Sequence, residues 1–283
     1  MTPVGLAHLT QLALPPPDLV STAASAGYDF VGVRVRPATS GEHAYPMRPG
    51  SPMSRETLMR LDDTGLEVRD VEFLPLGPET GPQDWNPALE AGAALGARTV
   101  TVAGADPDPQ RLTDALAALT ADAAAAGIRP ALEPISYQPV STLAGAAAIA
   151  SAAGAAVLPD ALHLQRGGNT VDDVRALDPD LVPCLQLCDG PLDAPQHLDL
   201  PADLPLGMTA DGSVRQIESR FRRQRVGDGE LPLAALVAAL PSGTPLSVEV
   251  PRAAPRDARD PVRDAQQNLR SVRELLGAVN ARA

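Results

Sequence analysis

Short apolar runs alternate along the chain with longer stretches that are rich in alanine and leucine. The runs are five to eight residues long, and most read as near-continuous Val, Leu and Ala. That pattern is typical of strands buried on both faces in a parallel sheet. We therefore predict strands at residues 5–12, 30–36, 67–74, 98–103, 129–133, 156–160, 182–188 and 245–250.

The stretches between these runs have the composition of helices, and several end just before a glycine suited to a left-handed cap. Helices are predicted at residues 18–26, 55–64, 87–95, 109–126, 141–153, 171–177, 230–240 and 260–279. Strands that alternate with helices imply parallel βαβ units. Eight repeats predict an α/β protein with one domain, residues 1–283, folded as a closed (β/α)₈ TIM barrel. A doubly wound sheet lacks support, because no G-x-G-x-x-G follows the first run.

Two connections are longer than usual for such units. Residues 37–54 follow the second predicted strand, and residues 189–229 follow the seventh. In a TIM barrel the loops after the strands form the active-site face, so both segments are candidate lids. The second also carries several arginines between positions 215 and 225, for which the sequence offers no structural task. We therefore predict that residues 189–229 form a lid-like loop.

Four of the late apolar runs each carry one polar side chain able to bind a metal. They are Glu133, Asp160, Gln186 and Glu249, all at or near the carboxyl ends of predicted strands. A carboxylate buried in such a run costs several kcal/mol unless it is paired or binds a cation. Four on successive strands predict one shared site, and their oxygen donors indicate a hard divalent metal. A single capping or salt-bridging carboxylate is the alternative for each residue taken alone.

Further polar residues are candidates for substrate contacts at the same face. His163 follows Asp160 by three positions and has the best context of the four histidines, whereas His8 is equally well explained as a hydrogen-bonded core histidine. Arg36 is a candidate for a substrate carboxylate or phosphate, or a solvated arginine at a strand end. Glu72 is a candidate site residue, or the partner of Arg34 or Arg36 in an ion pair.

Composition narrows the functional classes. The formal net charge of −12 argues against a nucleic-acid partner, which usually requires a basic face. All basic residues are arginines, so a Schiff base on a lysine of this chain is excluded. No apolar run approaches the roughly 20 residues of a membrane span, and the first residues lack a signal-peptide pattern. We expect a cytoplasmic protein that binds no membrane. Cys184 and Cys188 are predicted to be small buried hydrophobes.

The chain resembles the sugar phosphate isomerase/epimerase branch of the xylose isomerase-like TIM-barrel superfamily. The resemblance covers nearly the whole chain and rests on the following segments: Gly27-Tyr-Asp-Phe-Val-Gly-Val-Arg34, Thr64-Gly-Leu-Glu-Val68, Val71-Glu72, Ala94-Leu-Gly-Ala-Arg98, Leu132-Glu133, Asp160-Ala-Leu-His163, Leu185-Gln-Leu-Cys-Asp189, Arg225-Val-Gly-Asp-Gly-Glu230 and Ser247-Val-Glu-Val250. These motifs are specific to the superfamily rather than to a substrate.

The resemblance implies one divalent cation, Mn²⁺ or Mg²⁺ in the first place and Co²⁺ or Zn²⁺ as alternatives. Its ligands map onto Glu133, Asp160, Gln186 and Glu249. Gln186 stands where most members carry histidine, and its neutral oxygen favours Mg²⁺ or Mn²⁺ over Zn²⁺. Glutamine here is similar to the dehydratase members, such as those acting on dehydroshikimate or inosose. Members of such families often pair, so a homodimer is also expected.

The chemistry that follows is proton transfer on a polyhydroxy ketone. The metal would chelate a ketone and an adjacent hydroxyl, while Glu133 and Glu249 remove and return the α-proton through an enediolate. His163 or Arg225 would stabilise the oxyanion or a leaving group. The outcome is isomerisation or epimerisation of a keto-polyol, or dehydration if a β-hydroxyl leaves. An abasic-site endonuclease would need more histidines and a basic groove, and a non-catalytic binding barrel is the remaining alternative.

Overall fold

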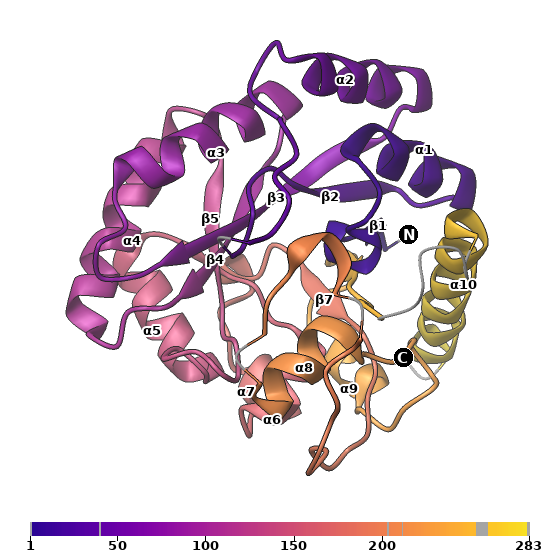
Figure 1. Ribbon diagram of the computed structural model, residues 1–283. Helices are drawn as coiled ribbons and strands as arrows, with labels where there is room; N and C mark the ends of the chain where they lie inside the picture. The colour runs from indigo at the N-terminus through magenta and orange to yellow at the C-terminus, as the bar shows by residue number, and fades with distance from the viewer. Residues whose placement is uncertain (1, 40, 203, 211, 253–259, 282–283) are drawn as a thin grey trace.

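The strands close into a parallel barrel in the computed structural model, which describes residues 2–39, 41–202, 204–210, 212–252 and 260–281 (Figure 1). They are β1 (Val4–Leu6), β2 (Phe30–Arg34), β3 (Glu67–Leu76), β4 (Thr99–Gly104), β5 (Arg129–Glu133), β6 (Ala156–Val157), β7 (Leu185–Leu187) and β8 (Leu246–Val248). Each strand pairs with its sequence neighbour, and β1 also pairs with β8. A parallel bridge between Asp160 and Gln186 joins β6 to β7 and completes the ring.

Helices surround the barrel and cover its outer surface (Figure 1). They are α1 (Pro16–Ala26), α2 (Pro52–Thr64), α3 (Pro82–Leu95), α4 (Pro109–Ala124), α5 (Leu143–Ala153), α6 (Ala161–Arg166), α7 (Val171–Arg175), α8 (Val214–Phe221), α9 (Leu233–Ala238) and α10 (Pro261–Asn280). The predicted (β/α)₈ TIM barrel is therefore confirmed. Within the described ranges, every helix is too short or too polar to cross a bilayer.

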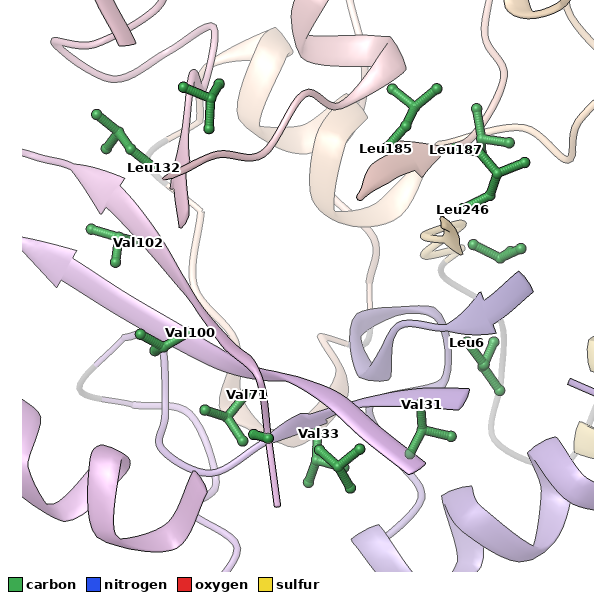
Figure 2. Close-up of a cluster of buried hydrophobic side chains, with 14 of the residues drawn as sticks. Leu6, Val31, Val33, Val71, Val100, Val102, Leu132, Leu185, Leu187 and Leu246 are labelled. Carbon is green, nitrogen blue, oxygen red and sulfur yellow. The ribbon is translucent and has the colours of Figure 1, made fainter. Parts of the chain in front are cut away.

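The apolar core lies between the strands and the helices. Side chains such as Leu6, Val31, Val33 and Val100 project from the strands into this layer and are fully buried (Figure 2). Alternate residues of a strand point to the other face, here the inside of the barrel. Ala131, Ala156 and Leu158 form a separate small apolar cluster on that side. Because the main apolar core lies outside the strands, inward-facing positions at the carboxyl end of the barrel can be polar.

Local structure differs from the sequence prediction at the first strand and at two helices. The first strand ends at Leu6 and is followed by the 3₁₀ helix η1 (His8–Gln11), so the prediction that His8 lies inside a strand is wrong. Two helices, α6 and α8, were not predicted. Asp160 caps α6 by accepting a hydrogen bond from the His163 amide, and Ser213 caps α8 in the same way.

The segment 189–229 is fixed at both ends by one carboxylate, among the residues that the structure describes. Asp189 accepts hydrogen bonds from the amides of Gly190, Gly227 and Leu231. The backbone of Asp189 also forms an antiparallel bridge with Gln224. These contacts of Asp189 fix the segment that contains α8 to the barrel, and α8 contacts α6. That the segment acts as a lid stays a prediction.

The close approach of Gly5 to Phe30 gives a test of barrel packing. A Cβ at Gly5 would lie 2.1 Å from the Phe30 ring, so we expect Gly5→Ala to lower the free energy of unfolding by about 1–3 kcal/mol. Gly277 in α10 has open space, and Gly277→Ala should instead stabilise by up to about 1 kcal/mol. Urea unfolding followed by circular dichroism measures both. Equal effects of the two substitutions would contradict this packing.

Candidate active site

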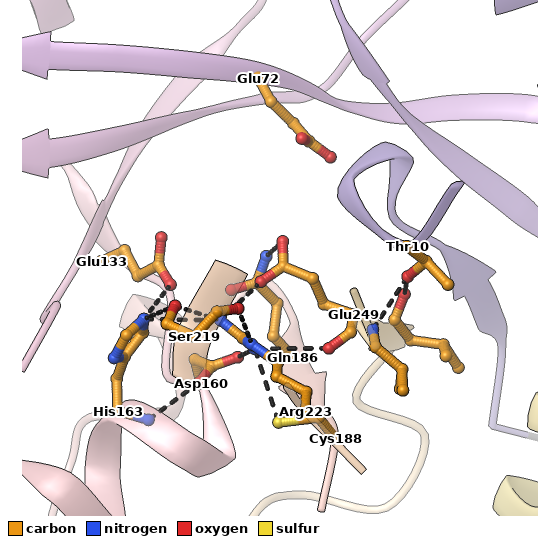
Figure 3. A network of polar contacts seen from close by, with 12 residues as sticks. Thr10, Glu72, Glu133, Asp160, His163, Gln186, Cys188, Ser219, Arg223 and Glu249 are labelled. Carbon is orange, nitrogen blue, oxygen red and sulfur yellow. Dashed lines mark hydrogen bonds and ion pairs between the residues drawn. The ribbon is translucent and has the colours of Figure 1, made fainter. Parts of the chain in front are cut away.

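The four candidate ligands lie together at the carboxyl ends of their strands (Figure 3). Glu133 is the last residue of β5, Asp160 follows β6, Gln186 lies in β7, and Glu249 follows β8. All four are buried, and Asp160 is completely inaccessible. The Asp160–Gln186 bridge sets two of them side by side, and Gln186 Nε2 donates a hydrogen bond of 3.1 Å to Glu249 Oε1. The barrel closure itself therefore assembles the polar centre.

His163 joins this group because α6 begins directly at Asp160. Ligand atoms of Glu133, Asp160 and His163 all lie within 4.8 Å of one another, which is the geometry of a possible metal triad. His163 Nε2 is 3.9 Å from Glu133 Oε1. The first turn of α6 points the imidazole inward.

Arg223 lies at the middle of the cluster, and sequence reasoning did not single it out. Its Nη1 atom is 2.5 Å from Asp160 Oδ2, and its Nη2 atom is 3.0 Å from Glu249 Oε2. Its Nε atom donates to the carbonyl of Ser219 in α8. The Arg223 side chain is only 1% exposed. It is one of several arginines near the end of α8, and nothing in the local sequence distinguishes it from Arg225.

Burial controls the protonation of the site. Burial, and then the charges of Glu249 and Asp160, raise the pKa of Glu133 well above its usual range. Burial also raises the pKa of Glu249 to about 7, although the Arg223 guanidinium opposes the shift. The pKa of His163 is lowered to about 3, mainly by burial, so the imidazole is neutral. The site thus combines carboxyl groups that hold protons strongly with a histidine that does not.

Hydrogen bonds fix the tautomer and the orientation of His163. Its Nδ1 atom accepts from the amide of Ser136 at 3.4 Å and lies 3.1 Å from the Ser136 hydroxyl. The proton is therefore assigned to Nε2, which lies 3.1 Å from Ser219 Oγ. Tyr137 packs edge-on against the ring. His163 thus presents an N–H group towards the carboxylate cluster.

The cluster forms the floor of an open cleft. Its walls are apolar and come from loops after several strands, with Leu9, Phe73, Ile135, Tyr137 and Met208 among them. The largest group of polar residues lies at the base, where Glu133, Gln186, His163, Arg223 and Glu249 all line the cleft. A concave site that combines apolar side chains with convergent polar groups is typical of small-molecule binding.

Glu72 and Arg34 form a second polar group on the opposite wall. Arg34 Nη2 is 3.2 Å from Glu72 Oε2, and Arg34 Nη1 is 2.7 Å from Glu42 Oε1. The ion pair of Glu72 with Arg34, one of two sequence-based alternatives, is therefore present. Both residues also line the cleft, so Glu72 remains a candidate for substrate contact.

Three other predicted substrate residues lie outside the cleft lining. His8 accepts from the Arg34 amide through Nδ1 and donates to the Leu14 carbonyl through Nε2, which is the core histidine of the alternative interpretation. Arg36 donates to the Asp84 carbonyl. Arg225 hydrogen-bonds Gln267 and Asn268 of α10, away from the cluster. Their substrate roles stay predictions without a supporting contact.

Comparisons with known proteins agree with this architecture. A family model described as "Xylose isomerase-like TIM barrel" matches residues 20–275. No curated protein sequence matches the chain significantly. A structure titled xylose isomerase-like TIM barrel/4-hydroxyphenylpyruvate dioxygenase fusion protein is similar over 99% of this chain, with 19% identity and a TM-score of 0.76. This chain spans only 43% of that longer protein.

Two further solved structures match over nearly their whole length. One is an L-ribulose 3-epimerase, with 15% identity, a TM-score of 0.71, and coverage of 100% of this chain and 97% of the other. The other is the probable 3-DHS dehydratase AsbF involved in petrobactin synthesis from Bacillus anthracis, with 12% identity, a TM-score of 0.67, and coverage of 95% and 99%. At these identities the likeness shows the fold alone.

The raised pKa of Glu249 predicts a specific pH dependence of stability. A folded pKa of about 7 against an unfolded value of 4.5 means that the contribution of Glu249 to stability is complete below pH 4.5 and is lost as the pH rises towards 7. The difference in unfolding free energy between metal-free wild type and Glu249→Gln should fall by on the order of 3 kcal/mol across this window.

Urea unfolding in the presence of a chelator at several pH values measures this difference. The histidines with lowered pKa, His8 and His163, contribute to both proteins and cancel in the comparison. Parallel stability curves for the two proteins would contradict the assignment.

Proposed function

Because the chain belongs to the xylose isomerase-like TIM-barrel family, we propose that it is a divalent-metal-dependent isomerase or epimerase of a keto-polyol. The reaction would pass through an enediolate. The observation that carries the proposal is the convergence of Glu133, Gln186 and Glu249 at the base of one cleft, with Asp160 buried directly beside Gln186. Carboxylates gathered in this way at the carboxyl end of a barrel are arranged for chemistry rather than for stability.

The residues present fit a divalent cation. Gln186 Oε1 is buried and has no hydrogen-bond partner among the described residues, while the amide nitrogen of the same side chain is held by Glu249. Among the described residues, the basic side chain nearest to Glu133 is that of His163, whose Nε2 atom lies 3.9 Å from Glu133 Oε1. Carboxylate and amide oxygens with one imidazole suit Mn²⁺ or Mg²⁺, and Co²⁺ or Zn²⁺ are alternatives. Glu133, Asp160, Gln186 and Glu249 would hold the ion, with His163 beside them.

A bound cation would supply Lewis acidity towards the ketone and an adjacent hydroxyl. The other tasks fall to side chains of this chain. The proton would be taken and returned by Glu133, at the end of β5, and by Glu249, which follows β8. Burial raises the pKa of both groups, to about 7 for Glu249, which suits proton transfer by that residue near neutral pH. The neutral imidazole of His163 would donate its Nε2 proton in a hydrogen bond to a substrate oxygen. The apolar walls of the cleft would exclude water from the intermediate.

A metal-dependent dehydratase of a cyclic or sugar-like β-hydroxy ketone is the second candidate. Gln186 at a ligand position favours it, because the sequence resemblance associates glutamine there with dehydratases. One structural neighbour is titled a probable 3-DHS dehydratase, and another an epimerase, so the fold accommodates both reactions. The same enediolate explains either outcome. A polyhydroxy ketone substrate, a cytoplasmic location, a homodimer and the absence of nucleic-acid and membrane partners remain our predictions.

Proton exchange in D₂O separates these reactions and tests the function. Enzyme loaded with Mn²⁺ is incubated with a panel of keto-polyols and with 3-dehydroshikimate, and the products are followed by NMR and ultraviolet absorbance. Deuterium incorporation next to the ketone without loss of water supports the isomerase, and an enone absorbance supports the dehydratase. No turnover of any of these compounds, together with no bound metal, would contradict both.

Replacement of Glu249 by glutamine tests its role in proton transfer. Glu249→Gln keeps the shape of the side chain and should preserve the fold, but we expect turnover to fall by about 10²–10⁴-fold because a proton acceptor is lost. Metal content measured on the same sample separates loss of the base from loss of the ion. Thr10 hydrogen-bonds the Val250 amide and the Val248 carbonyl beside Glu249, outside the cluster. Thr10→Ser keeps that hydroxyl and is the matched control. Near-normal turnover of Glu249→Gln would eliminate its assigned role.

Replacement of Gln186 by histidine tests direct ligation. Histidine offers a nitrogen donor in place of the buried amide oxygen, so Gln186→His should still bind metal but shift its preference from Mg²⁺ and Mn²⁺ towards Co²⁺ and Zn²⁺. Competition titrations with pairs of ions measure the shift. The same order of preference in both proteins would argue against Gln186 as a ligand.

A further inference from the structure

The Arg223 guanidinium occupies the position between Asp160 and Glu249 where a cation is needed. Its two terminal nitrogens contact one carboxylate each, at 2.5 Å from Asp160 Oδ2 and 3.0 Å from Glu249 Oε2. We propose that Arg223 is an internal competitor of the metal, which neutralises the centre when the ion is absent and must leave Asp160 and Glu249 when the ion binds. This inference rests on the proposed function and describes how the same site is loaded.

The two cations cannot both occupy the space between these oxygens. A divalent ion lies roughly 2.0–2.2 Å from its carboxylate ligands. An ion bound at Asp160 Oδ2 and Glu249 Oε2 would therefore be in contact with both terminal nitrogens of Arg223. A divalent ion and the singly charged guanidinium repel each other strongly at that distance in a buried site. Either the ion or the guanidinium must give way.

The other oxygen of each carboxylate already accepts a hydrogen bond. Asp160 Oδ1 accepts from the His163 amide, and Glu249 Oε1 accepts from Gln186 Nε2. The oxygens that face Arg223, Asp160 Oδ2 and Glu249 Oε2, are therefore the ones most open to a metal once the guanidinium has moved. Without Arg223 or an ion, two carboxylates would be buried without a counter-charge, which is strongly destabilising. Arg223 therefore stabilises the metal-free protein and opposes metal binding by the same contacts.

Displacement of the Arg223 guanidinium would also change the contacts of α8, in the 189–229 segment. Arg223 follows α8 directly and binds back to it, through the Ser219 carbonyl at 2.8 Å and the Ser219 hydroxyl at 3.2 Å. The same hydroxyl lies 3.1 Å from His163 Nε2. Release of the guanidinium therefore removes one of the contacts that tie α8 to the carboxylate cluster. Metal loading and the position of α8 are linked through one side chain.

Metal affinity of an Arg223 variant tests the proposal without an activity assay. Arg223→Met removes the charge and keeps an apolar side chain of similar reach. Mn²⁺ binding is measured by isothermal titration calorimetry at pH 8 on chelator-stripped protein. We expect the variant to bind Mn²⁺ at least tenfold more tightly than wild type. In the metal-free state its melting temperature should be lower, and Mn²⁺ should raise that temperature by more than it does in wild type.

Two further variants complete the experiment. Arg220→Met makes the same charge change in the same cleft, but Arg220 contacts neither carboxylate, so its Mn²⁺ affinity should stay within about threefold of wild type. Arg223→Lys keeps the charge but cannot bridge both carboxylates with one ammonium, so its affinity should lie between those of wild type and Arg223→Met. It also covers the case in which Arg223→Met does not fold.

The outcomes separate this inference from the proposed function. Tighter binding in the Arg223 variants alone supports the competition. Equal Mn²⁺ affinity in all four proteins overturns the competition and leaves a metal-dependent enzyme in place. Absence of Mn²⁺ binding in every protein, including Arg223→Met, overturns both.

Discussion

Burial of three carboxylates at one end of the barrel is the constraint on which the site depends. Glu133, Asp160 and Glu249 are each at most 5% exposed and belong to separate strands or strand ends. Such a group is stable only with positive charge and hydrogen-bond donors nearby. In this chain the donors are the His163 amide, the Gln186 side chain and the Arg223 guanidinium. Arg223 supplies positive charge to these carboxylates, and it thereby links the carboxyl end of the barrel to the segment after β7.

The same constraint explains how the barrel closes and why its interior is small. β6 has only two residues, and its contact with β7 depends on the Asp160–Gln186 bridge, which joins two of the proposed ligands. Ala131 and Ala156 inside the ring leave space that larger aliphatic residues would fill. Stability then comes mainly from the outer layer of Val and Leu against the helices (Figure 2). The fold separates its apolar packing from its polar centre by the alternation of side chains along each strand.

Sequence reasoning identified the strands and the four strand-end residues, because both signals are local. A polar residue in an apolar run, such as Glu133, is visible without knowledge of its partners. The position of Arg223 depends on contacts with residues 63 and 26 positions away, which no local pattern reports. The helix before it was detectable, since Val214, Ile217 and Phe221 recur at helical spacing after the cap at Ser213. His8 was predicted to lie in the first strand, but that strand ends at Leu6 and His8 begins a 3₁₀ helix. Such short helices have little sequence signature.

The orientation of the Gln186 amide ties these observations together. A side-chain amide has one donor end and one acceptor end, and the hydrogen-bond network decides which way it points. Here the donor end faces Glu249 Oε1, because the reverse orientation would set two oxygens against each other at 3.1 Å. The acceptor end is therefore left buried, with no donor among the described residues. Arg223 neutralises Asp160 and Glu249 but does not reach this oxygen. A guanidinium alone thus neutralises the two carboxylates but leaves the Gln186 oxygen without a partner. A cation with several oxygen ligands would neutralise the carboxylates and also bind that oxygen.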